Sequence, residues 1–107
     1  MSFVVRKFPL AEQDVLDAAI WYEERQPGLG DEFLEEVDRA VRVLSDSALH
    51  HGIRFADVRR TSVHRFKFYG IYYIVRAEEL WILAIFHGSR HPRVLRERIE
   101  EVGRASD

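Results

Sequence analysis

A run of seven apolar residues near the end of the chain constrains its fold more than any other feature. The run, LWILAIF at residues 80–86, is followed at once by HGSRHPRVLRER, which extends to residue 98. A short, almost continuous apolar stretch with aromatic and β-branched residues is typical of a buried strand. We therefore expect a central strand that leaves the core directly into a cluster of histidines and arginines.

Length and composition favour a single cytoplasmic domain. A chain of 107 residues is long enough for one hydrophobic core but not for two. No apolar stretch approaches the roughly 20 residues that a membrane span needs, and the N-terminus, MSFVVRKFPL, does not resemble a secretory signal. The absence of cysteine excludes disulfides and thiolate metal sites. We expect one domain over residues 1–107, with no membrane segment and no cofactor.

The two halves of the chain carry opposite charge. Residues 1–50 contain five Lys and Arg against eleven Asp and Glu, a net of −6, whereas residues 51–107 contain eleven against seven, a net of +4. Arginine supplies fourteen of the sixteen cations, which favours bidentate recognition of phosphate or carboxylate. A simpler explanation of this charge asymmetry is that the acidic half pairs with the basic half inside one fold.

The first half predicts a strand and two helices. Residues 3–8 (FVVRKF) are β-rich and stop at Pro9, which cannot donate to a sheet ladder. From Leu10 the apolar residues recur at helical spacing until RQPGLGD, residues 25–31, where a proline and two glycines end the helix. Asp31 is the expected N-cap of a second helix, which completes an αα-hairpin. Its expected core positions are Ala11, Val15, Ala18, Ala19, Trp21, Tyr22, Phe33, Val37, Ala40, Val41 and Leu44.

The second half predicts three strands and a short helix. The strands are VRRTSVHRF (58–66), FYGIYYIVR (68–76) and LWILAIF (80–86), with FKF as the first connection and residues 77–79 as the second. Pro92 then suits the start of a C-terminal helix, PRVLRERIEEV. The order β-α-α-β-β-β predicts an α+β domain of two layers, in which the helix hairpin covers one face of a small, mainly antiparallel sheet.

This architecture leaves the other sheet face open in our prediction. The arginines of the second half would gather on that face and at the strand end, where His87 and Arg90 emerge. A concave patch of arginine, tyrosine and histidine suits a phosphate backbone or an acidic peptide. A metal site is not expected, because Gly88 and Pro92 oppose the continuous helix that would bring His87 and His91 onto one face.

Three segments together resemble a known family. They are AAIWYEERQPGLGDEFLEEVDRAVRVL, VRRTSVHRFKFYGIYYIV and LWILAIFHGSRHP, and the resemblance spans about residues 10 to 98. In this order and spacing they resemble the ParE/RelE superfamily of toxins from bacterial type II toxin–antitoxin modules, and especially its ParE-like branch, the plasmid-stabilisation proteins. The fold that this resemblance implies, an N-terminal strand, a helix hairpin and an antiparallel sheet, is similar to the one derived above.

The resemblance implies a toxin that arrests growth and is neutralised by a cognate antitoxin wrapped around it. ParE-like toxins act by binding DNA gyrase, whereas RelE-like toxins cut messenger RNA on the ribosome. A third alternative is a non-toxic remnant of the family that still binds a partner. An apolar groove beside the helix hairpin is expected to receive an amphipathic helix of the partner.

The residue at position 70 helps to distinguish a gyrase-binding toxin from an RNA-cleaving one. RelE-like sequences place an arginine in the third strand, and the matching stretch here, YGIYY, holds Gly70. RNA cleavage needs a base, an acid and cations for the phosphate, so this departure favours binding over cleavage and leaves it open whether the chain is an enzyme. If it is a metal-independent nuclease, the candidate residues are Arg65, Lys67, Tyr69, His87 and Arg90. The expected target-binding or antitoxin-binding residues are Arg59, Arg60, Arg65, Trp81, His87, Arg90 and Arg93.

Overall fold

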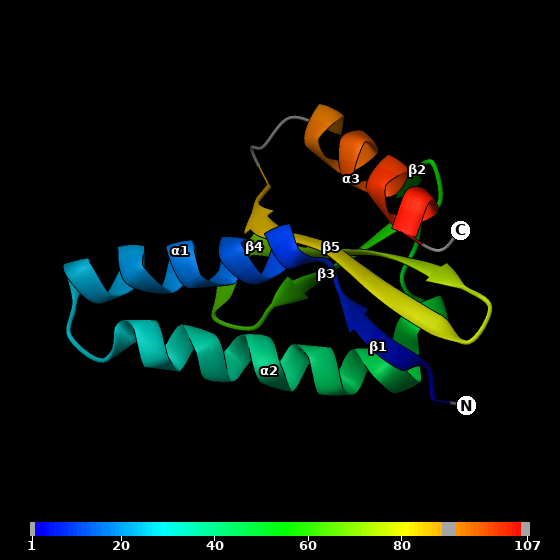
Figure 1. Cartoon of the computed structure of the whole chain (residues 1–107). Helices are drawn as coiled ribbons and strands as arrows, with labels where there is room; N and C mark the ends of the chain where they lie inside the picture. Colours follow the sequence, from blue (N-terminus) through cyan, green and yellow to red (C-terminus); the bar gives the residue numbers. More distant parts are fainter. Residues whose placement is uncertain (1, 89–91, 106–107) are drawn as a thin grey trace.

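The sheet of this protein has helices on both of its faces. The computed structural model describes residues 2–88 and 92–105, and its five strands lie in the order β1-β5-β4-β3-β2 (Figure 1). The expected α+β fold is confirmed. The elements are β1 (Val4–Lys7), α1 (Pro9–Arg25), α2 (Leu29–Ser47), a 3₁₀ turn (Ala48–His50), β2 (Ile53–Phe55), β3 (Val58–Val63), β4 (Phe66–Arg76), β5 (Glu79–His87) and α3 (Pro92–Ala105).

The two long helices form the expected αα-hairpin around a tight turn. Gly28 has φ +89°, a left-handed conformation that glycine adopts without steric cost, and α2 begins immediately after it. The prediction that Asp31 is the N-cap is therefore wrong, because Asp31 lies inside the first turn of α2. The free backbone N–H groups at this helix start are satisfied instead by the Glu23 carboxylate, which accepts from Gly28 (2.9 Å) and Gly30 (3.0 Å).

The strands pair largely as predicted, with three differences. β1 lies parallel to β5, and the other pairs are antiparallel. FKF is not a connection, because β4 already begins at Phe66 and the chain turns at His64 and Arg65, the latter with φ +70°. The turn between β4 and β5 is Ala77–Glu78, since β5 begins at Glu79. The short strand β2 was not predicted, because three residues are too few to show an alternating pattern.

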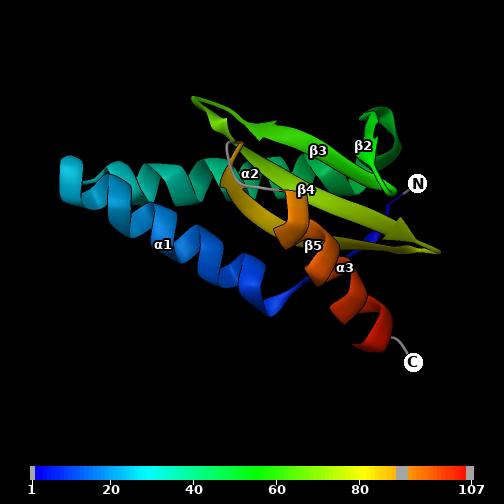
Figure 2. The same ribbon diagram turned by 90° about the horizontal axis from the view of Figure 1, so that it is seen from above.

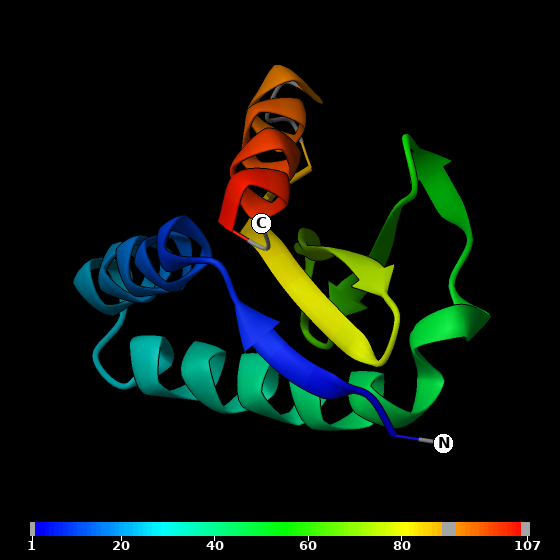
Figure 3. The same cartoon turned by 45° about the vertical axis from the view of Figure 1, so that its right-hand side comes forward.

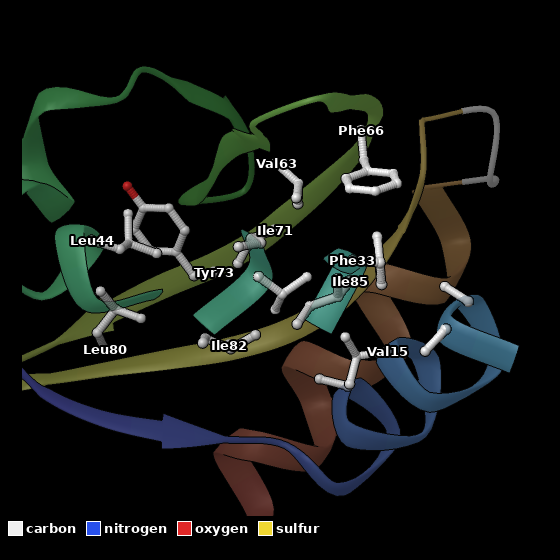
Figure 4. Close-up of a cluster of buried hydrophobic side chains, with 14 of the residues drawn as sticks. Val15, Phe33, Leu44, Val63, Phe66, Ile71, Tyr73, Leu80, Ile82 and Ile85 are labelled. Atoms are coloured by element: carbon white, nitrogen blue, oxygen red, sulfur yellow. The ribbon is translucent and has the colours of Figure 1, made fainter. Parts of the chain in front are cut away.

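The main core lies between the helix hairpin and the sheet (Figure 4). Phe33 of α2 is fully buried there, as are several residues of β4 and β5. Tyr73 is also fully buried and donates its hydroxyl proton to the Ala48 carbonyl, while burial raises its pKa to about 12. The labelled members of this cluster in Figure 4 are Val15, Phe33, Leu44, Val63, Phe66, Ile71, Tyr73, Leu80, Ile82 and Ile85.

The far face of the sheet is not open, which corrects our prediction. Figures 1 and 3 show α3 on the side of β5 opposite α2. Leu95 and Val102 of α3 are buried in a second cluster with Tyr72, Ile74 and Leu83, and Ile99 packs against that cluster. These positions of α3 recur at i, i+4 and i+7, so the C-terminal helix carries its own apolar stripe. The continuous apolar run of β5 follows from this arrangement, because both faces of the strand are covered.

The helices carry no membrane-spanning signal. Among residues 2–88 and 92–105, none of the helices combines the length and the apolar character that crossing a bilayer requires.

Candidate functional site at the end of β5

The expected strand-end site lies where β5 leaves the core. His87 is exposed there and pairs in register with Tyr69 of β4. Its ring stacks on that of Phe68 at 5.9 Å between centroids and 14° between planes, and it meets Tyr69 edge-on at 5.8 Å. The backbone N–H of Gly88 donates to the Phe68 carbonyl at 2.8 Å. The strand thus ends in a cluster of rings whose outermost member, Phe68, is 66% exposed.

A pocket of about 230 Å³ opens between α1 and this strand end. Trp21 forms part of its wall and is 47% exposed, so our assignment of Trp21 to the core is wrong. The Arg25 guanidinium lies 3.4 Å from the centre of the Trp21 ring, a stacked cation–π contact that fixes the indole on the surface. The other lining residues are Asp14, Asp17, Ala18, Tyr69, Ile85, Phe86 and His87.

Arg60 lies on the far face of the sheet, beside the same strand end. Its Nε donates to the Tyr72 hydroxyl (3.1 Å) and its Nη1 to the Ser62 hydroxyl (3.0 Å). A Cβ added at Gly70 would lie 2.3 Å from Arg60 Nε, so the guanidinium fills the space above this glycine. Within the described residues no carboxylate lies within ion-pair distance of Arg60. The guanidinium of Arg60, on the neighbouring strand, therefore covers position 70, which has no side chain of its own.

Two of the other predicted cations have structural contacts elsewhere. Arg59 donates to the carbonyls of His51 (2.5 Å) and Leu49 (3.5 Å), which holds the segment before β2 against β3. Arg65 lies in the β3–β4 turn, with its Nη2 3.4 Å from the Glu32 carboxylate of α2. Arg59 lies away from the end of β5, because it pairs with Tyr73, which in turn pairs with Ile82.

The remaining candidates lie on three different elements. Lys67 is exposed on β4, and Arg93 is exposed on α3. Trp81 is half-buried against the far-face cluster, and its Nε1 donates to Glu79 at 3.3 Å. The hydrogen bond from Arg6 lowers the pKa of Glu79. Arg90 and His91 lie outside the described residues.

Of the four nuclease candidates that the structure describes, Tyr69 and His87 are in direct contact. Tyr69 packs against the rings of Tyr22 and Phe33, and this burial raises its pKa, partly offset by the Arg25 cation. A tyrosine with a raised pKa stays protonated at neutral pH and is unsuited to act as a general base. In the part of the chain that the structure describes, no group of three or more His, Asp or Glu side chains is placed to hold a metal ion.

Sequence patterns missed the buried ion pair between Asp14 and Arg98. Arg98 Nη1 lies 2.6 Å from Asp14 Oδ2, and its Nη2 lies 3.2 Å from Oδ1, which makes the pair bidentate. The side chains are only 9% and 7% exposed. Asp14 also accepts from the backbone N–H of Ile85 (3.1 Å), and Arg98 donates to the Leu83 carbonyl (2.8 Å). Asp14 forms one wall of the pocket, so this pair links α1, β5 and α3 at the site.

The pair also closes an edge of the sheet. β1 pairs with β5 only as far as Ile82, so the edge of β5 beyond that residue has no neighbouring strand in the described chain. An uncovered edge exposes backbone N–H and C=O groups that need partners. The carboxylate and the guanidinium provide these partners at Ile85 and Leu83. A sequence shows that Asp14 and Arg98 are charged, but not that they meet, because 84 positions separate them.

Comparisons with known proteins agree with this fold. Residues 5–92 match the family model described as the ParE toxin of the type II toxin–antitoxin system parDE. The fold is similar to a solved structure of the chromosomal ParDE toxin–antitoxin system from P. aeruginosa, with a TM-score of 0.71 and 17% identity over 80% of this chain and 96% of that one. Among curated proteins, none matches the sequence significantly. Because the family model covers most of its length, the chain belongs to the ParE toxins of ParDE toxin–antitoxin systems.

Proposed function

We propose that this toxin arrests growth by binding DNA gyrase and that its cognate antitoxin neutralises it by covering surfaces of the toxin. The observation that favours binding over RNA cleavage is the aromatic packing of the strand end. Tyr69 lies among aromatic rings, its pKa is raised by burial, and position 70 is a glycine. General acid–base cleavage needs a base, an acid and a cation within hydrogen-bond reach of one phosphate.

Inhibition of gyrase is the expected result of a supercoiling assay. Purified toxin added to gyrase and relaxed plasmid should reduce the supercoiled product or trap cleaved plasmid, and prior addition of the cognate antitoxin should restore supercoiling. Messenger RNA in a parallel translation reaction should remain intact. New mRNA ends that depend on translating ribosomes, with normal supercoiling, would contradict the proposal.

One observation favours ribosome-dependent RNA cleavage as a second candidate. The Arg60 guanidinium occupies the space above Gly70, so a cation is present near the position where RelE-like toxins have theirs. Among the described residues it has hydroxyl partners and no carboxylate partner, which leaves its charge available to a phosphate. If the toxin cleaves RNA on the ribosome, new mRNA ends should appear in the translation reaction, and Arg60→Met should abolish them.

The antitoxin surface that we propose is a groove between α1 and α2. It has a volume of about 390 Å³ and is lined by Leu16, Ile20 and Leu34, with the acidic side chains of Glu23 and Asp31 at its margin. Leu16 and Ile20 are four residues apart on α1 and are 45% and 57% exposed. Exposed apolar side chains at this spacing suit the apolar stripe of an amphipathic helix.

Replacing Ile20 by aspartate should weaken antitoxin binding by about tenfold or more, because an apolar anchor is lost and a charge must be desolvated. The matched control is Leu49→Asp, which changes an equally exposed apolar residue (57%) outside the groove and should leave the affinity unchanged. Titration calorimetry with purified antitoxin measures both. Equal affinities for the two variants would rule out this groove as the antitoxin surface.

A further inference from the structure

The hairpin of β3 and β4 carries positive formal charge only. Its residues, 58–76, include five Lys and Arg and no Asp or Glu. Figure 2 views the sheet from the α3 side, where α3 lies over β5 and β3 lies beside it. Arg60 of β3 is half-buried on this face, next to Tyr72 of the second cluster. A cationic strand of this kind attracts anions to the face on which its arginine lies.

Two hydroxyl groups beside Arg60 have protons to donate. The Tyr72 oxygen accepts a hydrogen bond from Arg60 Nε, and the Ser62 oxygen accepts one from Nη1. Each hydroxyl also has one proton of its own to donate. Among the described residues neither proton has an acceptor. Both are therefore available to an oxygen atom of a ligand.

The third donor at this position is Nη2 of Arg60, which lies near the strand end. It has no acceptor within the described chain. A Cβ added at Gly88 would lie 3.8 Å from this nitrogen and 3.9 Å from the Tyr72 hydroxyl. Gly88 thus lies beside two of the donors and covers neither with a side chain. Three donor groups and no carboxylate of the described chain meet here, which is the composition of an anion site.

The arrangement of the donors favours a phosphate over a carboxylate. A carboxylate binds arginine best through two parallel N–H bonds along one edge of the guanidinium. Both edges that could do this include a nitrogen that already donates, Nε to Tyr72 or Nη1 to Ser62. The donors that remain belong to three different side chains. Arginine, tyrosine and serine side chains are common partners of the phosphate oxygens of nucleic acids.

We propose that Arg60, Tyr72 and Ser62 bind a backbone phosphate of the DNA that gyrase holds, so that the toxin contacts the enzyme and its DNA together. This inference rests on the proposed function, because gyrase is the enzyme that brings the DNA to the toxin. The contact involves no chemical step: the guanidinium neutralises one phosphate, and the two hydroxyls donate to its oxygens. The site is separate from the α1–α2 groove that we assign to the antitoxin.

The test compares the affinity of the toxin for gyrase with and without a saturating linear DNA duplex. Fluorescence anisotropy of labelled toxin, titrated with gyrase, measures both affinities. DNA should strengthen binding about tenfold, because one charge-assisted contact is added. Salt should reduce this gain, because a phosphate that is neutralised by arginine releases counterions.

Three variants locate the contact. Arg60→Met should abolish the gain from DNA. Gly70→Ala should also abolish it although the charge is kept, because the added Cβ would lie 2.3 Å from Arg60 Nε and the guanidinium must move away. Arg42→Met removes the same charge from an exposed position of α2 and should keep the gain. Circular dichroism checks that each variant is folded.

The outcomes separate this inference from the proposed function. Equal affinities with and without DNA would overturn the phosphate site and leave gyrase binding intact. An equal loss of affinity by Arg60→Met in both conditions would also overturn it, since Arg60 would then contact gyrase itself. A loss of the gain in Arg42→Met would show a general effect of charge. No binding to gyrase in either condition would overturn both proposals. If Arg60→Met fails to fold, Gly70→Ala decides the question.

Discussion

Replacing Arg98 by methionine is expected to lower the free energy of unfolding by about 3–5 kcal/mol. The substitution keeps most of the side-chain volume but leaves the Asp14 carboxylate buried without its counter-charge. It also removes the donor to the Leu83 carbonyl, so the edge of β5 loses one of its two partners. Urea unfolding followed by circular dichroism measures the change directly.

Two further variants test whether burial of the ion pair is the cause of the large loss of stability. Arg65→Met removes the same type of side chain from an ion pair with Glu32 whose members are 50% and 47% exposed, and it should change the stability by no more than about 1 kcal/mol. The double variant Asp14→Leu with Arg98→Met removes both charges together and should recover part of the loss, because no unpaired charge remains. Equal midpoints for Arg98→Met and Arg65→Met would show that the buried pair does not stabilise the fold.

The pair also illustrates which parts of this fold could be predicted from sequence. Local patterns located the helix hairpin and the last two strands, because apolar periodicity and turn residues act over a few neighbouring positions. The ion pair joins α1 to α3 across most of the chain, and no local pattern carries that information.

The sequence itself contains a feature that argues against our prediction of an open far face of the sheet. A strand covered on one face alternates apolar and polar residues, whereas LWILAIF is apolar at every position. Ala84 and Phe86 on the α3 side are as deeply buried as Ile85 on the hairpin side. The continuous run therefore required a cover on both faces, and the apolar stripe of the tail was the segment left to supply it.

The candidate site was predictable only in part. The abrupt change after Phe86 located the strand end. The pairing of His87 with Tyr69 there was shown by the structure, where the hairpin fixes the register of its two strands. The direction in which each arginine side chain points was not predictable from the sequence. Arg59 and Arg60 are adjacent on β3, yet the first binds carbonyls on the hairpin side and the second lies above Gly70 on the other face.

Phe33→Ala and Trp21→Ala should differ widely in their effect on stability, although both residues were assigned to the core by helical spacing. Phe33 is fully buried and its ring contacts those of Tyr22, Phe66 and Tyr69. Truncating Phe33 to alanine should lower the free energy of unfolding by about 3–5 kcal/mol, since it leaves a cavity at the centre of the main core.

Trp21 is half-exposed on α1 and contacts Arg25 and one edge of Tyr22, so its removal should cost about 1 kcal/mol. Urea midpoints of the two variants measure the difference, with Leu49→Asp as an exposed reference. If Trp21→Ala unfolds as easily as Phe33→Ala, the indole belongs to the core and not to the wall of the pocket. If it remains as stable as expected, a loss of gyrase inhibition by that variant can be assigned to the pocket at the end of β5, because the fold that presents the pocket is intact.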